Sequence, residues 1–227
     1  MKILNLVLYS ENEPAYRTMR DVLRAHASRY PDVRTVFYMY DPVIKDSWIL
    51  DGDILRIRGN ETYVPGILNK TVEAFRITAD WDYDMLIRTN ISTIVDFSGI
   101  VGYCTGPDFT FGGPFQILRW LDPRGGIFDG RFSGMSFVSG WCMIFTRATI
   151  TLMINDSHFI DTSVIDDVTI SDFLIRKRNV KPTDLMFKSV GITTEYDPTK
   201  YIFRNCTYGN RMADVDRMRD IASRIHP

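Results

Sequence analysis

The chain has 227 residues, 45% of them hydrophobic and 24% charged, and a formal net charge of −1. This length fits one domain with a sizeable core. A nearly neutral chain without a basic run lacks the cationic surface of a general nucleic-acid-binding protein, and no apolar stretch reaches the roughly 18 residues that a membrane-spanning helix needs.

The first hundred residues predict alternating strands and helices. Four apolar runs predict strands, at residues 3–9, 33–40, 53–57 and 83–87. Helical periodicity predicts a first helix opened by a Ser10-x-x-Glu13 capping box, and a second helix with Ile67, Leu68 and Phe75 on one face. Such alternation is typical of a mostly parallel sheet covered on both faces.

Regular patterns stop in residues 102–134, where glycines cluster among aromatic residues and prolines, and a long loop of this kind is usually functional. A strand follows at 135–145, broken at Ser139-Gly140, and a helix opens at Thr146. A helix start at Asp166-Asp167, two strands at 185–190 and 201–204, and a closing amphipathic helix complete the prediction. We find no repeat or linker and predict one domain.

The three cysteines, Cys104, Cys142 and Cys206, have neither a disulfide framework nor metal-ligand spacing. No signal-peptide pattern opens the chain. We therefore expect a cytoplasmic protein with reduced thiols, no membrane span and no nucleic-acid partner; the sequence leaves its oligomeric state open.

Ligands of open α/β sheets bind beyond the carboxyl ends of the strands. This rule selects three places in the sequence: Tyr9-Ser10 after the first strand, residues 88–92 after the central strand, and the turn at Asp166-Asp167.

Three blocks in these regions carry a family resemblance. The first joins Asn69-Lys70-Thr71 to Tyr83-Asp84-Met85-Leu86-Ile87-Arg88-Thr89-Asn90-Ile91-Ser92, the second is a Ser-Gly strand at 137–147, and the third is 165–170, followed by Ser171. Their order and spacing over about residues 60–175 resemble Fringe and the β-1,3-galactosyl- and N-acetylglucosaminyltransferases, which have glycine at the position of Ser171. The chain is also similar in style to single-domain GT-A glycosyltransferases of large algal viruses and bacteria.

The resemblance implies an α/β chain of the GT-A fold, with a central, mostly parallel mixed sheet flanked by helices. It implies one domain over 1–227, with a nucleotide-binding half at about 1–100 and an acceptor-binding half at about 101–227. The implied reaction moves a sugar from a UDP-sugar donor to a hydroxyl of a glycan or glycoprotein, with inversion. A non-catalytic nucleotide- or sugar-binding domain derived from such an enzyme is the alternative.

The resemblance also assigns candidate residues. Asp167 is the general base and Asp166 its helix cap or partner, although acidic residues at a helix start are also explained by capping alone. The residue types themselves, and not the resemblance, suggest that Gly140 permits the close approach of a ligand and that Trp141 stacks on a sugar, with a core position as the other interpretation of Trp141. The candidate donor-binding residues are Tyr9, Ser10, Lys70, Arg88, Thr89, Asn90 and Ser92.

One departure concerns the metal ion. The family has acidic residues at the positions of Asn90 and Ser92, where they hold Mn²⁺ or Mg²⁺ on the donor diphosphate; neutral oxygens are weaker ligands for such cations. Two interpretations stay open. In the first, part of the cation's role is taken by basic side chains such as Lys70, Arg88, Arg204 or Arg211. In the second, a metal ion still bridges the diphosphate, held mainly by phosphate oxygens and water and oriented by Asn90 or Ser92.

Two other segments match the acidic motif literally. Asp80-Trp81-Asp82 and Asp82-Tyr83-Asp84 precede the central strand, so we predict that they lie at its amino end, away from the site. His26 lies on a helix face and is predicted to be structural.

Overall fold

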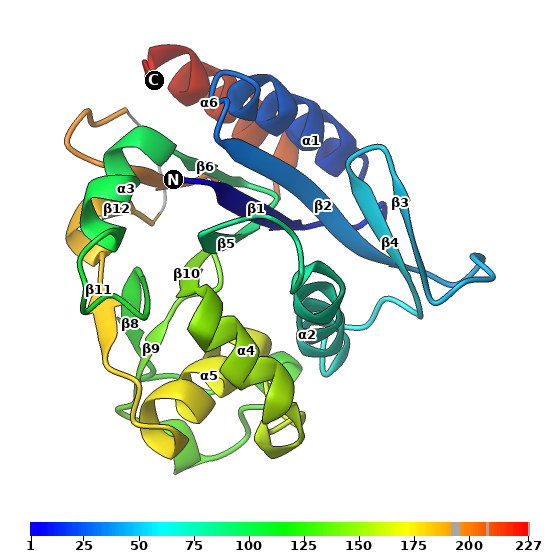
Figure 1. Ribbon diagram of the computed structural model, residues 1–227, viewed down its shortest axis with the longest axis vertical. Coiled ribbons are helices and arrows are strands. Elements are labelled where there is room, and N and C mark those ends of the chain that lie inside the picture. Colours follow the sequence, from blue (N-terminus) through cyan, green and yellow to red (C-terminus); the bar gives the residue numbers. More distant parts are fainter. Residues whose placement is uncertain (192–195, 208, 227) are drawn as a thin grey trace.

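A computed structural model describes residues 1–191, 196–207 and 209–226 and shows a central sheet with helices on both faces (Figure 1). The eight strands of this sheet run in the order β11-β7-β10-β5-β1-β2-β4-β3. Their bounds are β1 Ile3–Leu8, β2 Val33–Asp41, β3 Trp48–Asp51, β4 Ile54–Arg58, β5 Met85–Asn90, β7 Phe111–Gly113, β10 Cys142–Thr146 and β11 Pro182–Asp184.

The sheet is mixed, with a parallel centre. β1 pairs in parallel with β2 and β5, and β2 with β4, whereas β10 runs antiparallel to β5 and β7. The carboxyl ends of β1 and β5 therefore meet the amino end of β10. Two small sheets are built from β12 Ser189–Val190, β13 Ile202–Arg204 and β6 Thr93–Val95, and from β8 Phe115–Ile117 and β9 Ser136–Val138.

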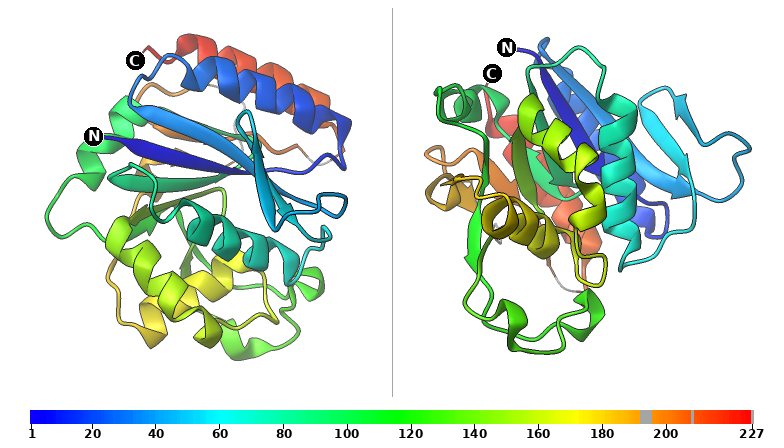
Figure 2. Two further views of the ribbon diagram at one scale, coloured as in Figure 1. Left: turned by 45° about the vertical axis from the view of Figure 1, so that its right-hand side comes forward. Right: turned by 60° about the horizontal axis from the view of Figure 1, so that its bottom comes forward.

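Helices cover the sheet in two layers. α1 (Pro14–Ala27) and α6 (Arg211–Arg224) lie side by side over one face, and α2 (Gly66–Thr78), α4 (Arg147–Asn155) and α5 (Asp166–Ser171) cover the other (Figure 2). α3 (Phe97–Cys104) packs beside β6, and α5 continues as a π-helix over Asp172–Lys177. Short 3₁₀ turns lie at Pro123–Gly125, Gly130–Phe132, Ser157–Phe159 and Met186–Lys188.

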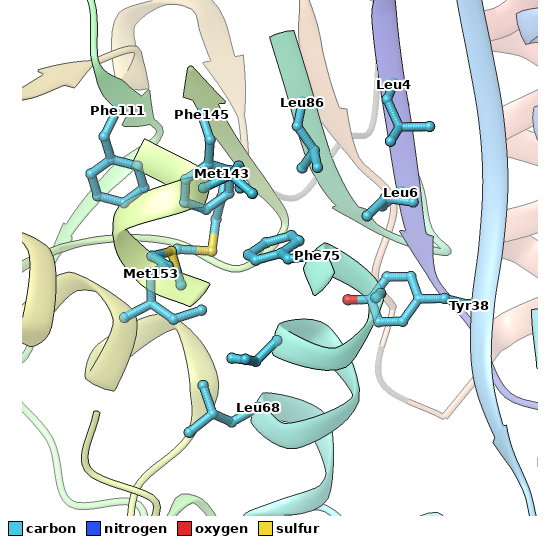
Figure 3. Close-up of a cluster of buried hydrophobic side chains, with 14 of the residues drawn as sticks. Leu4, Leu6, Tyr38, Leu68, Phe75, Leu86, Phe111, Met143, Phe145 and Met153 are labelled. Atoms are coloured by element: carbon cyan, nitrogen blue, oxygen red, sulfur yellow. The ribbon is translucent and has the colours of Figure 1, made fainter. Parts of the chain in front are cut away.

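Strand alternation assigns each core side chain to a layer. Tyr38 of β2 faces α2, while its neighbour Phe37 faces α1. On the α2 side, Phe75 packs edge-to-face on Phe145 at a centroid distance of 5.4 Å, and Phe111 stacks on Phe145 at 5.1 Å (Figure 3). Burying these rings stabilises the packing of α2 against the sheet, and this packing fixes the positions of the side chains that α2 presents to the site.

Most predicted elements are confirmed, including the helix at Thr146, whose side chain accepts a hydrogen bond from the Thr149 N–H. The predicted capping box is wrong. Glu13 is the N-cap of α1 without a side-chain cap, and Pro14, which needs no N–H partner at the first helical position, starts the helix. Half of the strand predicted at 185–190 is a 3₁₀ turn, Met186–Lys188, and β12 is confined to its last two residues.

The predicted end of the central strand is also wrong. β5 does not stop at Ile87 but continues through Asn90, because β1 on one side and β10 on the other supply hydrogen-bond partners for the additional residues. Residues 102–134 contain the end of α3 and two short strands, β7 and β8. Within the described residues, no helix combines the length and apolar character required to cross a bilayer. Cys104, Cys142 and Cys206 are free.

Candidate active site

Two adjoining cavities open where β1 and β5 end and β10 begins. The larger has a volume of about 660 Å³ and extends along the Tyr9-Ser10 end of β1; the smaller, of about 230 Å³, extends toward α5. They share five lining residues: Leu8, Tyr63, Ile67, Asn90 and Arg204. Asn90 thus lies where the two cavities meet.

Because β5 extends through Asn90, the predicted donor-binding residues 88–90 lie on two different faces of the strand. Side chains alternate along a strand, so Arg88 and Asn90 face α2 and α5, whereas Thr89 faces the other side. Thr89 is buried, its hydroxyl lies 3.3 Å from the Asn5 Oδ1, and it lines neither cavity.

Arg88 is buried beneath the smaller cavity. Its Nε donates to the Tyr38 hydroxyl at 3.1 Å, and its Nη2 donates to the Asp166 Oδ2 at 2.5 Å. Its Nη1 donates to the Gly140 carbonyl and, at 3.2 Å, to the Asn90 Oδ1. Burial disfavours the charged form, but Asp166, the Tyr38 hydroxyl and Asp167 together outweigh burial and raise the pKa of Arg88. Four of its five N–H groups are therefore committed inside the protein.

The two aspartates at the start of α5 differ. Asp166 is buried against Arg88, while Asp167 is partly exposed and lines the smaller cavity. Asp167 Oδ2 accepts from the Gly140 N–H and Oδ1 from the Val168 N–H, each at 2.9 Å. Burial, and then the negative charge of Asp166, raise the pKa of Asp167 to about 6. Neither residue is the helix N-cap, which is Ile165.

Gly140 lies in the turn between β9 and β10. A Cβ atom there would lie 2.9 Å from the Arg88 Nη1 and 3.2 Å from the Asp167 Cβ. The glycine therefore permits the approach of these two side chains, whereas the sequence suggested the approach of a ligand.

Trp141 is buried and forms part of the smaller cavity's wall, with the Arg204 guanidinium 5.5 Å from its ring centroid. Across the described residues its indole N–H has no hydrogen-bond partner. Trp120 and Tyr63 are more open, at 49% and 43% exposed, and border the same cavity.

The floor of the larger cavity is built from α2 and the β1 terminus. Lys70 is buried, and its Nζ donates to both Glu61 carboxylate oxygens, at 2.7 and 2.6 Å, and to the Tyr9 carbonyl at 3.3 Å. Burial lowers the pKa of Lys70, with Glu61 opposing the shift. The Tyr9 ring is buried beneath α1 and its hydroxyl accepts from Arg20. Ser10 and Ser92 also line this cavity.

Three arginines complete the larger cavity, from three different elements: Arg124 from the 3₁₀ turn at Pro123–Gly125, Arg204 from the end of β13, and Arg211 from the start of α6. Arg211 donates to the Asp214 Oδ2 at 2.5 Å. Asp214 is fully buried and also accepts from Arg217 at 2.7 Å, so this group of two guanidiniums and one carboxylate keeps a net positive charge.

The residues present do not fit a divalent metal site at the end of β5. Asn90 Oδ1 faces a guanidinium, and both Glu61 oxygens are bonded to Lys70. Within the described residues, no three His, Cys, Asp or Glu side chains gather as metal ligands.

No family model and no curated protein sequence matches the chain. A glycosyltransferase involved in the glycosylation of the major capsid of PBCV-1 superposes with a TM-score of 0.58 at 7% identity, over 97% of this chain and 100% of that one. The galactosyltransferase LgtC, in complex with donor and acceptor sugar analogs, gives 0.51 at 14% identity, over 99% and 96%. The fold is GT-A. These matches establish the fold, and the narrower likeness to the Fringe group stays a prediction.

Within this GT-A fold the predicted residues divide by place. Tyr9, Ser10, Lys70 and Ser92 line the larger cavity, while Arg88, Gly140, Trp141, Asp166 and Asp167 line the smaller. The sequence did not identify Tyr16, Glu61 or Tyr63, and within the 102–134 loop that it predicts to be functional it did not identify Arg124 or the other lining residues between 116 and 127.

The two literal acidic motifs and His26 lie elsewhere. Asp82 pairs with the Lys2 side chain and Asp84 accepts from the Lys2 N–H at 2.8 Å, at the amino end of β5, as predicted. His26 is buried with its Nε2 2.7 Å from the Val95 carbonyl oxygen, and burial lowers its pKa to about 4, which suits a structural residue.

Proposed function

We propose that this protein is a glycosyltransferase that moves a sugar from a UDP-sugar to a hydroxyl group of a glycan or glycoprotein acceptor. One observation carries the proposal: a cationic cavity and a cavity with a partly exposed carboxylate of raised pKa meet at the end of the central strand. The GT-A fold and the sugar complexes named for LgtC support it.

The larger cavity suits the nucleotide. Its volume of about 660 Å³ lies within the usual range for ligand sites, and its lining has four cationic residues against two carboxylates. A diphosphate placed near Asn90 directs the sugar into the smaller cavity, where Trp120 and Tyr63 offer exposed aromatic surface. Uridine is taken from the family resemblance.

Asp167 is the group placed to accept a proton. Each of its oxygens takes one backbone N–H and keeps further lone-pair capacity toward the cavity. The acceptor hydroxyl loses its proton to Asp167 as its oxygen bonds to the anomeric carbon, and the bond from that carbon to the phosphate oxygen breaks. UDP leaves with the bonding electron pair, so a single displacement inverts the anomeric centre.

Asp166 and Arg88 act through Asp167. Asp166 is committed to the Arg88 guanidinium, and Arg88 also holds the Gly140 carbonyl, whose residue donates its N–H to Asp167. We regard both as positioning residues that fix the direction of the Asp167 carboxylate.

A donor screen tests the function. Binding of UDP, GDP and CDP is measured first, followed by release of the diphosphate from a panel of UDP-sugars by the wild type, Asp167→Asn and the control Asp82→Asn. The proposal predicts nucleoside diphosphate binding and turnover that Asp167→Asn loses and the control retains. Failure of every nucleoside diphosphate to bind contradicts it, and binding by a wild type that never turns over supports the non-catalytic binding domain instead.

A further inference from the structure

We infer that the protein holds its donor diphosphate without a divalent metal ion, on a cationic wall formed by Arg124, Arg204 and Arg211 together with the side-chain amide of Asn90. This inference rests on the proposed function, since it concerns the same donor. It names the groups that balance the diphosphate charge.

The orientation of the Asn90 amide favours a contact with phosphate over a contact with a metal ion. Arg88 has only hydrogen-bond donors, so the Asn90 atom 3.2 Å from its Nη1 is the amide oxygen. The NH₂ group of Asn90 is left for the junction of the cavities, and it can donate to a phosphate oxygen but cannot bind a metal ion. A cation near the Oδ1 would also meet the Arg88 charge.

The carboxylates of the larger cavity also favour binding without a metal ion. The larger cavity is lined by two, Glu13 and Glu61, and Glu61 is fully engaged: Lys70 takes both oxygens and the Tyr40 N–H donates to Oε1 at 2.9 Å. A Mg²⁺ or Mn²⁺ site that also binds phosphates normally has one or two protein carboxylates free to coordinate. Glu13, the N-cap residue of α1, is therefore the one carboxylate of the described lining residues that is not bonded to Lys70.

The arginines are placed where they can balance the charge of the diphosphate. Arg204, like Asn90, lines both cavities, so it borders the junction where a diphosphate would join them. Arg211 is held in place by Asp214, which also accepts from the Thr207 N–H at 2.8 Å. Because Arg217 pairs with the same carboxylate, its single negative charge does not cancel both guanidiniums, and this part of the cavity stays positive. Guanidinium groups bind phosphate oxygens in a bidentate manner and so can replace a metal ion in charge and in geometry.

The direct test is a calorimetric titration of the wild type with UDP, in EDTA and in excess Mn²⁺, with a titration of Mn²⁺ into UDP alone as the blank. The inference predicts dissociation constants that agree within about threefold. Binding that Mn²⁺ strengthens by more than about tenfold overturns it and leaves the proposed function standing. No UDP binding in either buffer contradicts the proposed function itself.

Two variants locate the wall. Arg124 is exposed, so its replacement should not disturb the fold. Arg124→Gln should weaken UDP binding about tenfold in EDTA, because a charge-assisted contact to phosphate is lost, and it should leave the binding of uridine, which has no phosphate, unchanged. Arg131→Gln, an exposed arginine nearby in the chain that lines neither of the two cavities, is the matched control. Equal UDP affinity of the two variants overturns the assignment of Arg124.

Asn90→Asp tests the amide. It keeps the size of the side chain but replaces a donor with a carboxylate, so UDP binding in EDTA should fall about tenfold, with thermal unfolding confirming that the variant is folded. An unchanged affinity overturns the role of Asn90.

Discussion

The two cavities differ in how their charged groups are held. In the smaller, Arg88 and Asp166 are buried and paired at 2.5 Å, and they come from a central strand and a helix start. In the larger, the arginines come from a 3₁₀ turn, the end of a short strand and a helix start, and Arg124 is exposed. Proton transfer needs a fixed direction, whereas phosphate binding needs mainly positive charge, so we expect geometry to matter most in the first and charge in the second.

The largest effect should come from Asp167→Asn. Loss of the general base should lower kcat by about 10²- to 10⁴-fold while the UDP dissociation constant stays unchanged, because Asp167 lies in the smaller cavity. Initial rates and a UDP titration on one preparation measure both. A parallel loss of UDP affinity would show that the two cavities are not separate in function.

Removal of Arg88 should break the fixed geometry itself. Arg88→Met leaves Asp166 buried without its partner and should lower the free energy of unfolding by about 3–5 kcal/mol in a urea titration. The double variant Arg88→Met/Asp166→Leu should recover much of this loss without recovering activity. If the double variant is as unstable as the single one, the pair is not the reason for the loss.

The pH dependence sharpens the same contrast. The pKa of Asp167 is raised to about 6, so the carboxylate form that accepts a proton predominates above that pH. We expect kcat/KM to fall about tenfold for each pH unit below about 6 and to level off above it. UDP binding should show no such step, and a profile that is flat from pH 5 to 7 would argue against Asp167 as the base.

The smallest effect should come from the amino end of β5. Asp82→Asn removes an exposed ion pair with Lys2 and should change the free energy of unfolding by less than about 1 kcal/mol. Turnover should equal that of the wild type. A large loss of activity would mean that the literal acidic motif acts in the site after all.

The sequence predicted the position of the candidate site more closely than the arrangement of its side chains. Hydrophobic runs and the rule for strand ends led to Tyr9-Ser10, Asn90 and the two aspartates of α5, all of which line the cavities. The same patterns do not separate Thr89 from its neighbours, because the apolar run ends at Ile87 whereas β5, and with it the alternation of side chains, continues through Asn90.

Other features depend on tertiary contacts that no local pattern encodes. Arg124 lies in a loop with no periodicity, and Asp166 and Asp167 differ because Arg88, 78 residues away from Asp166, pairs with one of them. The orientation of the Asn90 amide likewise follows from the Arg88 guanidinium and not from its own sequence context.

The most direct test of the account is UDP release from UDP-sugars by protein kept in EDTA, compared between the wild type and Asp167→Asn. The account predicts turnover by the wild type with at least one donor and acceptor, and a loss of about 10²-fold or more in the variant, whose UDP affinity is retained. Equal rates for the two proteins, or a wild type that turns over only after Mn²⁺ is added, would contradict it.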